Sequence, residues 1–267
     1  MSDSQPILVI GGTRGTGLLI TRVLLRRGQR VRVLARKPER AARLFAPSVE
    51  IVAGDLTKPE TLPRALNGVQ HVIFTAGCRS GHPTSEPRVK AVEHDGVVNT
   101  LTAAFQAGFA GRFLYMTAGG VMTKNLATTC LNLWKGNTLL WRHRAESVIR
   151  ASDVDYTIIR CGVLLNCAGG GHIIVVTQQP LPLAWRYRIA RADVAEVFLA
   201  ALEHPNASRT TFETVWGRRG YRQPLPRLLE NLVCDHSSLG TEGMPNVLDG
   251  RSSRNNLYKC PQTSQRR

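Results

Sequence analysis

The chain has 267 residues, of which 43% are hydrophobic and 20% are charged, a composition typical of a globular protein that buries one large core. Its net charge is +16, with 35 lysine and arginine residues against 19 acidic ones. The basic residues are spread along the chain rather than gathered in one stripe or tail, which argues against nucleic-acid binding and favours attraction of small anionic ligands.

Short β-rich runs alternate with helical patterns in the first half of the chain, as a parallel sheet with crossover helices requires. The runs are apolar almost throughout, which is typical of strands covered on both faces. The pattern predicts strands at residues 7–10, 31–35, 49–53, 71–75, 112–117, 156–160, 173–176 and 211–216. It predicts helices near residues 15–27, 59–67, 89–108, 137–151 and 192–203. We therefore expect an α/β fold, a doubly wound parallel sheet of the Rossmann type, forming one domain with small substrate-side elements over residues 1–217.

A strand, a glycine turn and a helix follow one another in ILVIGGTRGTGLLITRVLLRRG, residues 7–28. The glycines give the spacing GxxxGxG, where the turn needs positive φ angles and a pyrophosphate must approach bare backbone. The helix that follows offers free N–H groups and the positive end of its dipole to phosphates. This context predicts a dinucleotide-binding loop with contacts from Gly11, Thr13, Arg14, Gly15, Thr16 and Gly17.

The end of the second predicted strand indicates which nucleotide binds. NAD-specific sites usually place Asp or Glu there, against the ribose 2′-hydroxyl, whereas a nearby Arg suits a 2′-phosphate. This chain has Arg36 and Lys37 at that point and no carboxylate before Glu39, and Arg14 can reach the same region. Two guanidinium groups around one phosphate form an effective clamp, so the sequence predicts NADP(H) as the cofactor.

The residues after the third and fourth predicted strands should follow the cofactor along the sheet edge. The carboxyl ends of parallel strands meet at one edge, where ligands of this fold bind. We expect adenine beside Asp55 and Leu56, which follow the third strand. The rest of the cofactor should lie along Thr75, Ala76 and Gly77, which follow the fourth.

The composition changes after Gly217. Residues 218–227 are basic and interrupted by proline, and residues 225–233 have the pattern of a short amphipathic helix. From Cys234 onward the chain is polar and rich in Ser, Asn and Gly, so it buries too little apolar surface to offset its ordering entropy. We predict a basic, largely disordered and flexible tail over residues 218–267.

The cysteines and the apolar runs exclude other classes of protein. Six cysteines show neither a CxxC pair nor a repeated spacing, so we expect no metal site and no disulfide framework. No apolar stretch reaches the roughly 18 residues of a membrane span, and no basic leader precedes the first apolar run. These patterns predict a cytoplasmic protein with free thiols.

Three later segments join the glycine loop GGTRGTG in a family resemblance: VEHDGVVNTLTAA (92–104), RAESVIRASDVDYTIIRCGVL (144–164) and RIARADVAEVFLAAL (188–202). From about Pro6 to Trp216 the chain resembles the short-chain dehydrogenase/reductase superfamily, in its atypical NmrA-like and biliverdin/flavin-reductase-like branch. The resemblance implies that the strand at 156–160 and the loop after it lie beside the nicotinamide. Cys161 stands where the branch usually has proline. The cofactor contacts implied there are Arg160, Cys161, Gly162 and Val163.

The catalytic dyad of that superfamily is missing from its usual place. The resemblance implies Tyr-x-x-x-Lys, in which the Tyr protonates the substrate oxygen and the Lys lowers the pKa of the Tyr. None of the five tyrosines has Lys four positions later, and none lies between Tyr115 and Tyr156. Thr117 matches the Ser or Thr that contacts substrate in the superfamily. On the helix, His143 or Arg142 is a candidate proton donor, with an exposed helix residue as the alternative interpretation.

Other residues near the expected substrate cleft also admit two interpretations. Lys124 and Lys135 lie in the segment that should border the cleft, but surface lysines are the simpler interpretation. Trp134, Leu140 and Trp141 either line an apolar pocket or pack in the core. No motif in this segment identifies a substrate, and the sequence does not give the oligomeric state.

Two functions therefore stay open. The first is an NADPH-dependent reductase without the dyad, because hydride transfer to a flavin or conjugated ring needs mainly positioning. The second is a non-catalytic NADP(H)-binding redox sensor, regulator or assembly factor that biases a protein partner. The first implies a small-molecule substrate and the second a protein partner; we favour the reductase slightly.

Overall fold

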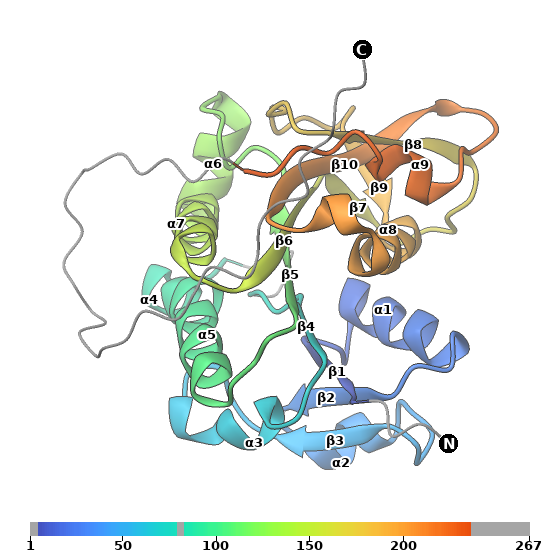
Figure 1. The fold of residues 1–267 in the computed structure, drawn as a ribbon. Helices are drawn as coiled ribbons and strands as arrows, with labels where there is room; N and C mark the ends of the chain where they lie inside the picture. Colours follow the sequence, from blue (N-terminus) through green and yellow to red (C-terminus); the bar gives the residue numbers. More distant parts are fainter. Residues whose placement is uncertain (1–4, 79–82, 236–267) are drawn as a thin grey trace.

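The computed structural model describes residues 5–78 and 83–235, and in these residues an eight-stranded sheet lies between two layers of helices (Figure 1). Its strands run in the order β3-β2-β1-β4-β5-β6-β10-β8. They are β3 (Glu50–Ala53), β2 (Val31–Ala35), β1 (Ile7–Ile10), β4 (His71–Phe74), β5 (Arg112–Ala118), β6 (Asp155–Cys161), β10 (Thr210–Arg219) and β8 (His172–Thr177). Neighbours pair in parallel, except β8, which is antiparallel to β10. The predicted doubly wound α/β fold is confirmed.

The helices divide between the two faces of the sheet. On one face lie α3 (Pro63–Leu66), α4 (Glu86–Lys90), α5 (Gly96–Gln106) and α7 (Thr138–Ala151), and on the other lie α1 (Gly15–Arg26) and α8 (Arg191–Glu203) (Figure 1). Each layer packs on its own cluster of buried strand and helix side chains. The strands alternate their side chains between these clusters, which explains their apolar sequences.

The predicted helix at 89–108 is part of a longer helical run with a defect in it. A π-helical turn at Ala91–Asp95 separates α4 from α5. Such turns widen the helix locally and are frequent at functional sites. Here the turn carries Glu93, which is 1% exposed and faces α7.

Several short elements were not predicted from the sequence. They include α2 (Pro38–Ala42), α6 (Leu126–Trp134) and a small parallel sheet of β7 (Val163–Leu165) and β9 (Arg188–Ala190). A capping box starts α6: Thr128 N–H donates to Asn125 Oδ1 at 2.9 Å, and Asn125 N–H donates to Thr128 Oγ1 at 2.9 Å. Short elements of this kind depend on tertiary contacts and leave little periodicity in the sequence.

The chain continues to pack beyond the expected domain boundary at residue 217. That position lies inside β10, and α9 (Leu225–Leu229) follows and packs against α8 with Leu229 buried. Farther on, the Asp235 carboxylate accepts hydrogen bonds from Tyr156 Oη and the Thr211 amide. The rest of the predicted tail, residues 236–267, lies outside the described residues.

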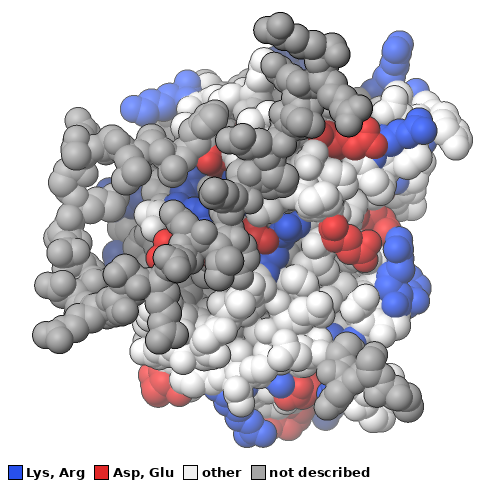
Figure 2. Space-filling view, in the orientation of Figure 1, with Lys and Arg blue, Asp and Glu red and all other residues white. Residues whose placement is uncertain are grey.

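The structure also bears on the distribution of surface charge, on membrane-spanning helices and on metal-binding groups. Figure 2 shows basic side chains at several separate places on one face, with acidic ones between them. Within the described ranges, no helix is both long and apolar enough to cross a membrane. The same residues bring together no group of three His, Cys, Asp or Glu side chains that could hold a metal ion.

Candidate functional site

The carboxyl ends of β1, β2, β4, β5 and β6 open onto a large crevice with a cavity of about 1350 Å³. In doubly wound sheets such a crevice forms where the strand order reverses, which here is between β1 and β4. Its glycine-loop end is lined by residues from segments 10–17, 34–36 and 54–56. Its opposite end, the α6 end, is lined by residues of α6 and α7 and by residues 183–185.

The glycine loop has the backbone that phosphate binding requires. Gly11 and Gly15 have φ angles of +86° and +54°, and a Cβ atom on Gly17 would lie 2.3 Å from the Gly11 carbonyl oxygen. Arg14 precedes α1 without capping it, and no acidic side chain occupies the first turn. The first N–H groups of α1 thus remain available to an anion, and these residues fit a dinucleotide pyrophosphate.

Arg191, at the start of α8, faces the same loop from the opposite side of the crevice. Its Nη1 donates to Thr16 Oγ1 at 3.0 Å and its Nε donates to Asn166 Oδ1 at 2.9 Å. Burial lowers the pKa of Arg191, although an arginine stays charged at neutral pH. Sequence reasoning missed this residue, because only the fold brings α8 next to α1.

The loops along the crevice match the predicted cofactor contacts closely. Two of the predicted residues, Lys37 and Arg160, do not line it; Lys37 is exposed just before α2. The residues that do line it are Gly11, Thr13, Arg14, Gly15, Thr16, Gly17, Arg36, Asp55, Leu56, Thr75, Ala76, Gly77, Thr117, Cys161, Gly162 and Val163. The Arg14 side chain donates to the Gly77 carbonyl at 3.1 Å, so it bridges the glycine loop and the loop after β4.

Arg160 points away from the crevice because neighbouring residues of a strand face opposite sides of a sheet. Its Nη2 lies 2.7 Å from Glu146 Oε2 of α7, inside the protein. Cys161 faces the other way and lines the crevice. Burial raises the pKa of the Cys161 thiol to about 12, so this cysteine stays protonated at neutral pH. It can pack against a cofactor but is no nucleophile.

Helix α7 presents Thr138 and Arg142 to the crevice and turns His143 away from it. Residues four apart lie on one helix face, and the next residue is rotated by about 100°. His143 instead lies near Glu146 and Arg150, and burial lowers its pKa. His143 thus does not line the crevice, and its role as a proton donor remains a prediction.

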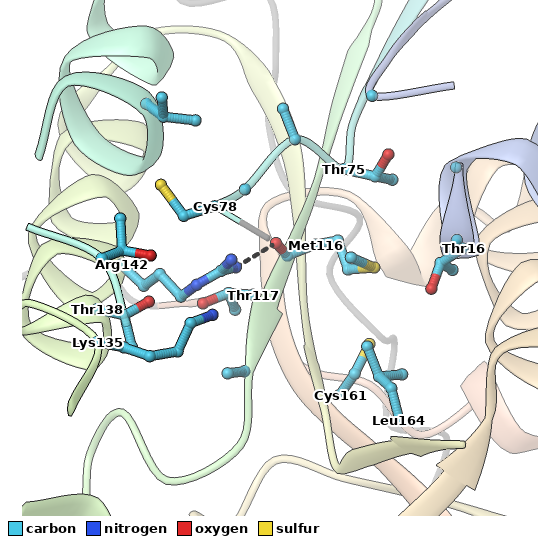
Figure 3. Close-up of a pocket in the computed structure, with 18 of the residues that line it drawn as sticks. Thr16, Thr75, Cys78, Met116, Thr117, Lys135, Thr138, Arg142, Cys161 and Leu164 are labelled. Atoms are coloured by element: carbon cyan, nitrogen blue, oxygen red, sulfur yellow. Dashed lines mark hydrogen bonds between the residues drawn. The ribbon is translucent and has the colours of Figure 1, made fainter. Parts of the chain in front are cut away.

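Arg142 is held in place by the buried carboxylate of Glu93. Its Nε lies 3.0 Å from Glu93 Oε2, its Nη2 donates to Oε1 at 3.1 Å, and its Nη1 donates to the Met116 carbonyl at 3.2 Å (Figure 3). The other Glu93 partners are the Cys78 amide and the Thr138 hydroxyl. A guanidinium fixed on both sides and always charged positions the loop after β4 but cannot supply a proton.

Lys135 is the functional candidate that sequence reasoning ranked too low. It follows α6, its side chain is 8% exposed, and it lines the crevice (Figure 3). Left-handed backbone at Gly136 (φ +54°) and Asn137 (φ +58°) turns the chain sharply between α6 and α7. This turn, written Lys-Gly-Asn in the sequence, is the signal that could have separated Lys135 from the surface residue Lys124.

Apolar side chains form the rest of the α6 end. Trp134 lines the crevice and is 46% exposed, as a residue at its mouth would be. Trp141 is buried instead, and its Nε1 donates to Glu86 Oε1 at 3.0 Å. Leu140 does not line the crevice. The remaining apolar lining residues at this end are Ala127, Leu131, Leu139, Leu183, Ala184 and Trp185.

The fold and the glycine-loop end together define a Rossmann-type dinucleotide-binding protein. The sequence matches the family described as NAD(P)H-binding over residues 11–205. The chain therefore belongs to this NAD(P)H-binding family, and the predicted resemblance to NAD(P)-binding proteins is confirmed.

Relatives named for different functions are similar to most of the chain. The uncharacterized sugar epimerase YhfK of Bacillus subtilis is 30% identical over 199 residues, covering 74% of this chain and 87% of its own. Sanguinarine reductase of Eschscholzia californica is 29% identical over 252 residues, covering 80% and 90%. The photosystem II assembly factor Ycf39 of Synechocystis is 25% identical over 241 residues, covering 87% and 69%.

Solved structures show the same fold. A putative NAD-dependent epimerase/dehydratase from Bacillus halodurans superposes with a TM-score of 0.72 at 21% identity, covering 86% of this chain and 100% of the other. A short-chain dehydrogenase/reductase from Veillonella parvula in complex with NADP gives a TM-score of 0.64 at 15% identity, covering 79% and 94%. At these identities the likeness concerns the fold.

Proposed function

We propose that the protein is an NADPH-dependent reductase that acts on a small conjugated molecule. The observation that carries this proposal is the crevice itself, which continues past Thr117 into the α6 end instead of closing there (Figure 3). A concave, largely apolar space with a few polar groups is the usual form of a small-molecule site. When bound, the cofactor supplies the hydride, and the residues of the chain bind and orient the acceptor.

NADP(H) is the form of the cofactor that the charges favour. The glycine loop and Arg191 would hold the pyrophosphate, and Arg36 lines the crevice where β2 ends and a 2′-phosphate would lie. The single acidic residue among the described lining residues is Asp55, whose carboxylate accepts from the Thr57 amide at 3.0 Å. Because the Asp55 carboxylate is bonded to its own loop, Arg36 is the charged side chain that would face the ribose at the end of β2.

The reductase proposal is tested by turnover. Purified protein with NADPH is offered a panel of flavins, quinones and open-chain tetrapyrroles, and cofactor oxidation is followed by absorbance. We expect turnover of at least one acceptor with NADPH and much slower turnover with NADH. Tight NADPH binding together with no turnover across the whole panel would refute the proposal.

A second candidate is a non-catalytic NADP(H)-binding regulator or assembly factor. Ycf39 relatives named as assembly factors favour it. So does Arg142, which stands on the helix where the superfamily carries its dyad and is locked by Glu93. This candidate predicts a protein partner whose capture changes with added NADP(H), because coupling requires different affinities for the two states. Capture that ignores NADP(H) would contradict a sensing role.

A further inference from the structure

Two polar side chains in the crevice have no partner for their donors. The Thr117 hydroxyl is buried and makes no hydrogen bond of normal geometry with a described residue; the hydroxyl beside it, Tyr115 Oη, donates to the Glu93 carbonyl at 3.5 Å. The Lys135 ammonium belongs to a residue 92% removed from solvent, since 8% of it is exposed, and no described residue pairs with it. Both side chains point into the cavity (Figure 3). A buried hydroxyl without a good partner is costly unless a ligand accepts from it, and the Lys135 ammonium faces the same space.

The acidic residue nearest in the fold cannot serve as that acceptor. Glu93 already accepts from Arg142, Thr138 and the Cys78 amide. Arg142 also donates to the carbonyl of Met116, the residue before Thr117, so the ion pair forms a fixed wall beside the two donors. Among the described residues, the carboxylate that lines the crevice is Asp55, at its far end. The α6 end therefore carries uncompensated positive charge.

We propose that Lys135 and Thr117 form an oxyanion site, and that Lys135 protonates the oxygen bound there. This inference rests on the proposed reductase function and narrows its acceptor to a conjugated carbonyl compound, such as a quinone or an aromatic ketone. Two preorganised donors stabilise charge as it develops on oxygen. Lys135, in the turn between α6 and α7, thus takes the role of proton donor that the superfamily gives to the missing tyrosine.

The step balances in atoms and electrons. The cofactor supplies one hydride to the carbonyl carbon, and the π electron pair of the C=O bond moves to the oxygen. That oxygen accepts hydrogen bonds from Thr117 Oγ1 and Lys135 Nζ, takes one proton from the ammonium, and becomes a hydroxyl. The neutral amine then regains a proton from water. The acceptor gains one hydride and one proton in total.

The groups around Lys135 fix the direction of its pH dependence. Burial lowers the pKa of Lys135, with Arg142 and Arg14 acting in the same direction and Glu93 and Cys78 opposing them. The arginines stay charged at all relevant pH values, and burial raises the pKa of Cys78, so this thiol stays neutral. The site therefore binds anions while Lys135 is protonated and loses this capacity as pH rises through the lowered pKa of Lys135.

Anion binding is tested without turnover. The NADP⁺-saturated protein is titrated by calorimetry with 2-naphthoate and with its neutral match, 2-naphthamide. We expect at least roughly tenfold tighter binding of the carboxylate to the wild type, and a preference within about twofold in Lys135→Met. Lys124→Met, at a lysine outside the crevice, should keep the full preference. Thr117→Val should lose part of it.

Two measurements keep the test decisive. The wild-type preference should decline at high pH, which needs no variant to fold. NADP⁺ affinity, measured separately, should stay within about twofold in Lys135→Met. Equal affinity of the wild type for both probes, or an undiminished preference in Lys135→Met, would overturn the oxyanion site.

Turnover of a quinone then tests the proton transfer. Lys135→Met should lower kcat by about 100-fold or more, and Lys135→Arg should retain anion binding while losing the fall in rate at high pH. An unchanged kcat in Lys135→Met would overturn the catalytic role. If the protein prefers the carboxylate probe but turns over no acceptor, the reductase proposal is overturned and the anion site of a binding protein is supported. Failure of the reductase proposal can therefore be distinguished from failure of the oxyanion site.

Discussion

The glycine-loop end of the crevice is built from loops that each follow directly from a parallel strand, whereas the α6 end is built from helices that approach the sheet from elsewhere in the chain. At the first end, backbone geometry dominates, as in the close approach of Gly17 to Gly11. At the second, a network of buried charges dominates, centred on Glu93 and Arg142. Cofactor binding therefore depends mainly on backbone geometry, and the α6 end depends mainly on buried charges. Substitutions can disturb one end without the other.

The largest effect is expected at the charged network of the α6 end. Glu93→Gln leaves the Arg142 guanidinium buried without its counter-ion, and should lower the free energy of unfolding by about 3 kcal/mol. Chemical denaturation of both proteins measures this difference. The control is Glu39→Gln, which removes an exposed carboxylate and should change stability by less than about 0.5 kcal/mol. Equal stability of Glu93→Gln and wild type would show that the ion pair does not organise this end.

The next effect is expected at the glycine loop. Gly17→Ala places a Cβ atom 2.3 Å from the Gly11 carbonyl oxygen, so the loop must shift out of its phosphate-binding shape. NADPH affinity should fall on the order of 100-fold, because N–H groups aimed at the pyrophosphate lose their alignment. Calorimetric titration with NADPH measures it, and circular dichroism checks the fold. Gly171→Ala, at a glycine with open space around it, should bind NADPH like the wild type. Wild-type affinity in Gly17→Ala would contradict the role of the loop.

The contrast between the two ends also explains what the sequence could predict. The strands and the glycine loop are encoded locally, by apolar runs and by glycine spacing, and these features occur where they were expected. Lys135 and Arg191 were ranked too low or missed, because their positions depend on which helices pack together. Of the two candidates on α7, Arg142 lines the crevice and His143 does not, and the sequence could not separate them because the faces of this helix depend on its rotation against the sheet. Arg160 was expected to contact the cofactor, but side chains alternate along β6, and Arg160 pairs with a glutamate of α7 instead of lining the crevice.

A buried acid behind the α6 end provides a pH test of the same contrast. Glu213 of β10 is 2% exposed, and its Oε1 lies 4.0 Å from Arg160 Nη1. Burial raises the pKa of Glu213 to about 7, although Arg160 opposes this shift. Since the folded-state pKa lies above that of the unfolded chain, the protonated carboxyl stabilises the fold at low pH. This contribution is lost as pH rises from the unfolded pKa of about 4.3 through 7.

Glu213→Gln isolates this contribution. The free energy of unfolding of the wild type, measured relative to Glu213→Gln, should fall by about 2 kcal/mol between about pH 5.5 and pH 8. Denaturant titrations of both proteins across that range give the difference directly. A difference that is constant with pH would mean that Glu213 ionises normally in the folded protein.

The smallest effect concerns the choice between the two nucleotides at the glycine-loop end. Arg36→Ala should weaken NADPH binding by about tenfold and leave NADH binding within about twofold, because the lost hydrogen bonds go only to the 2′-phosphate. Lys37→Ala is the matched control, since Lys37 is adjacent in sequence, equally basic, and outside the crevice lining. Equal losses for the two cofactors in Arg36→Ala would place Arg36 on a shared part of the dinucleotide. Losses confined to NADPH would show that this end selects its ligand by one side chain added to a backbone frame that serves either cofactor.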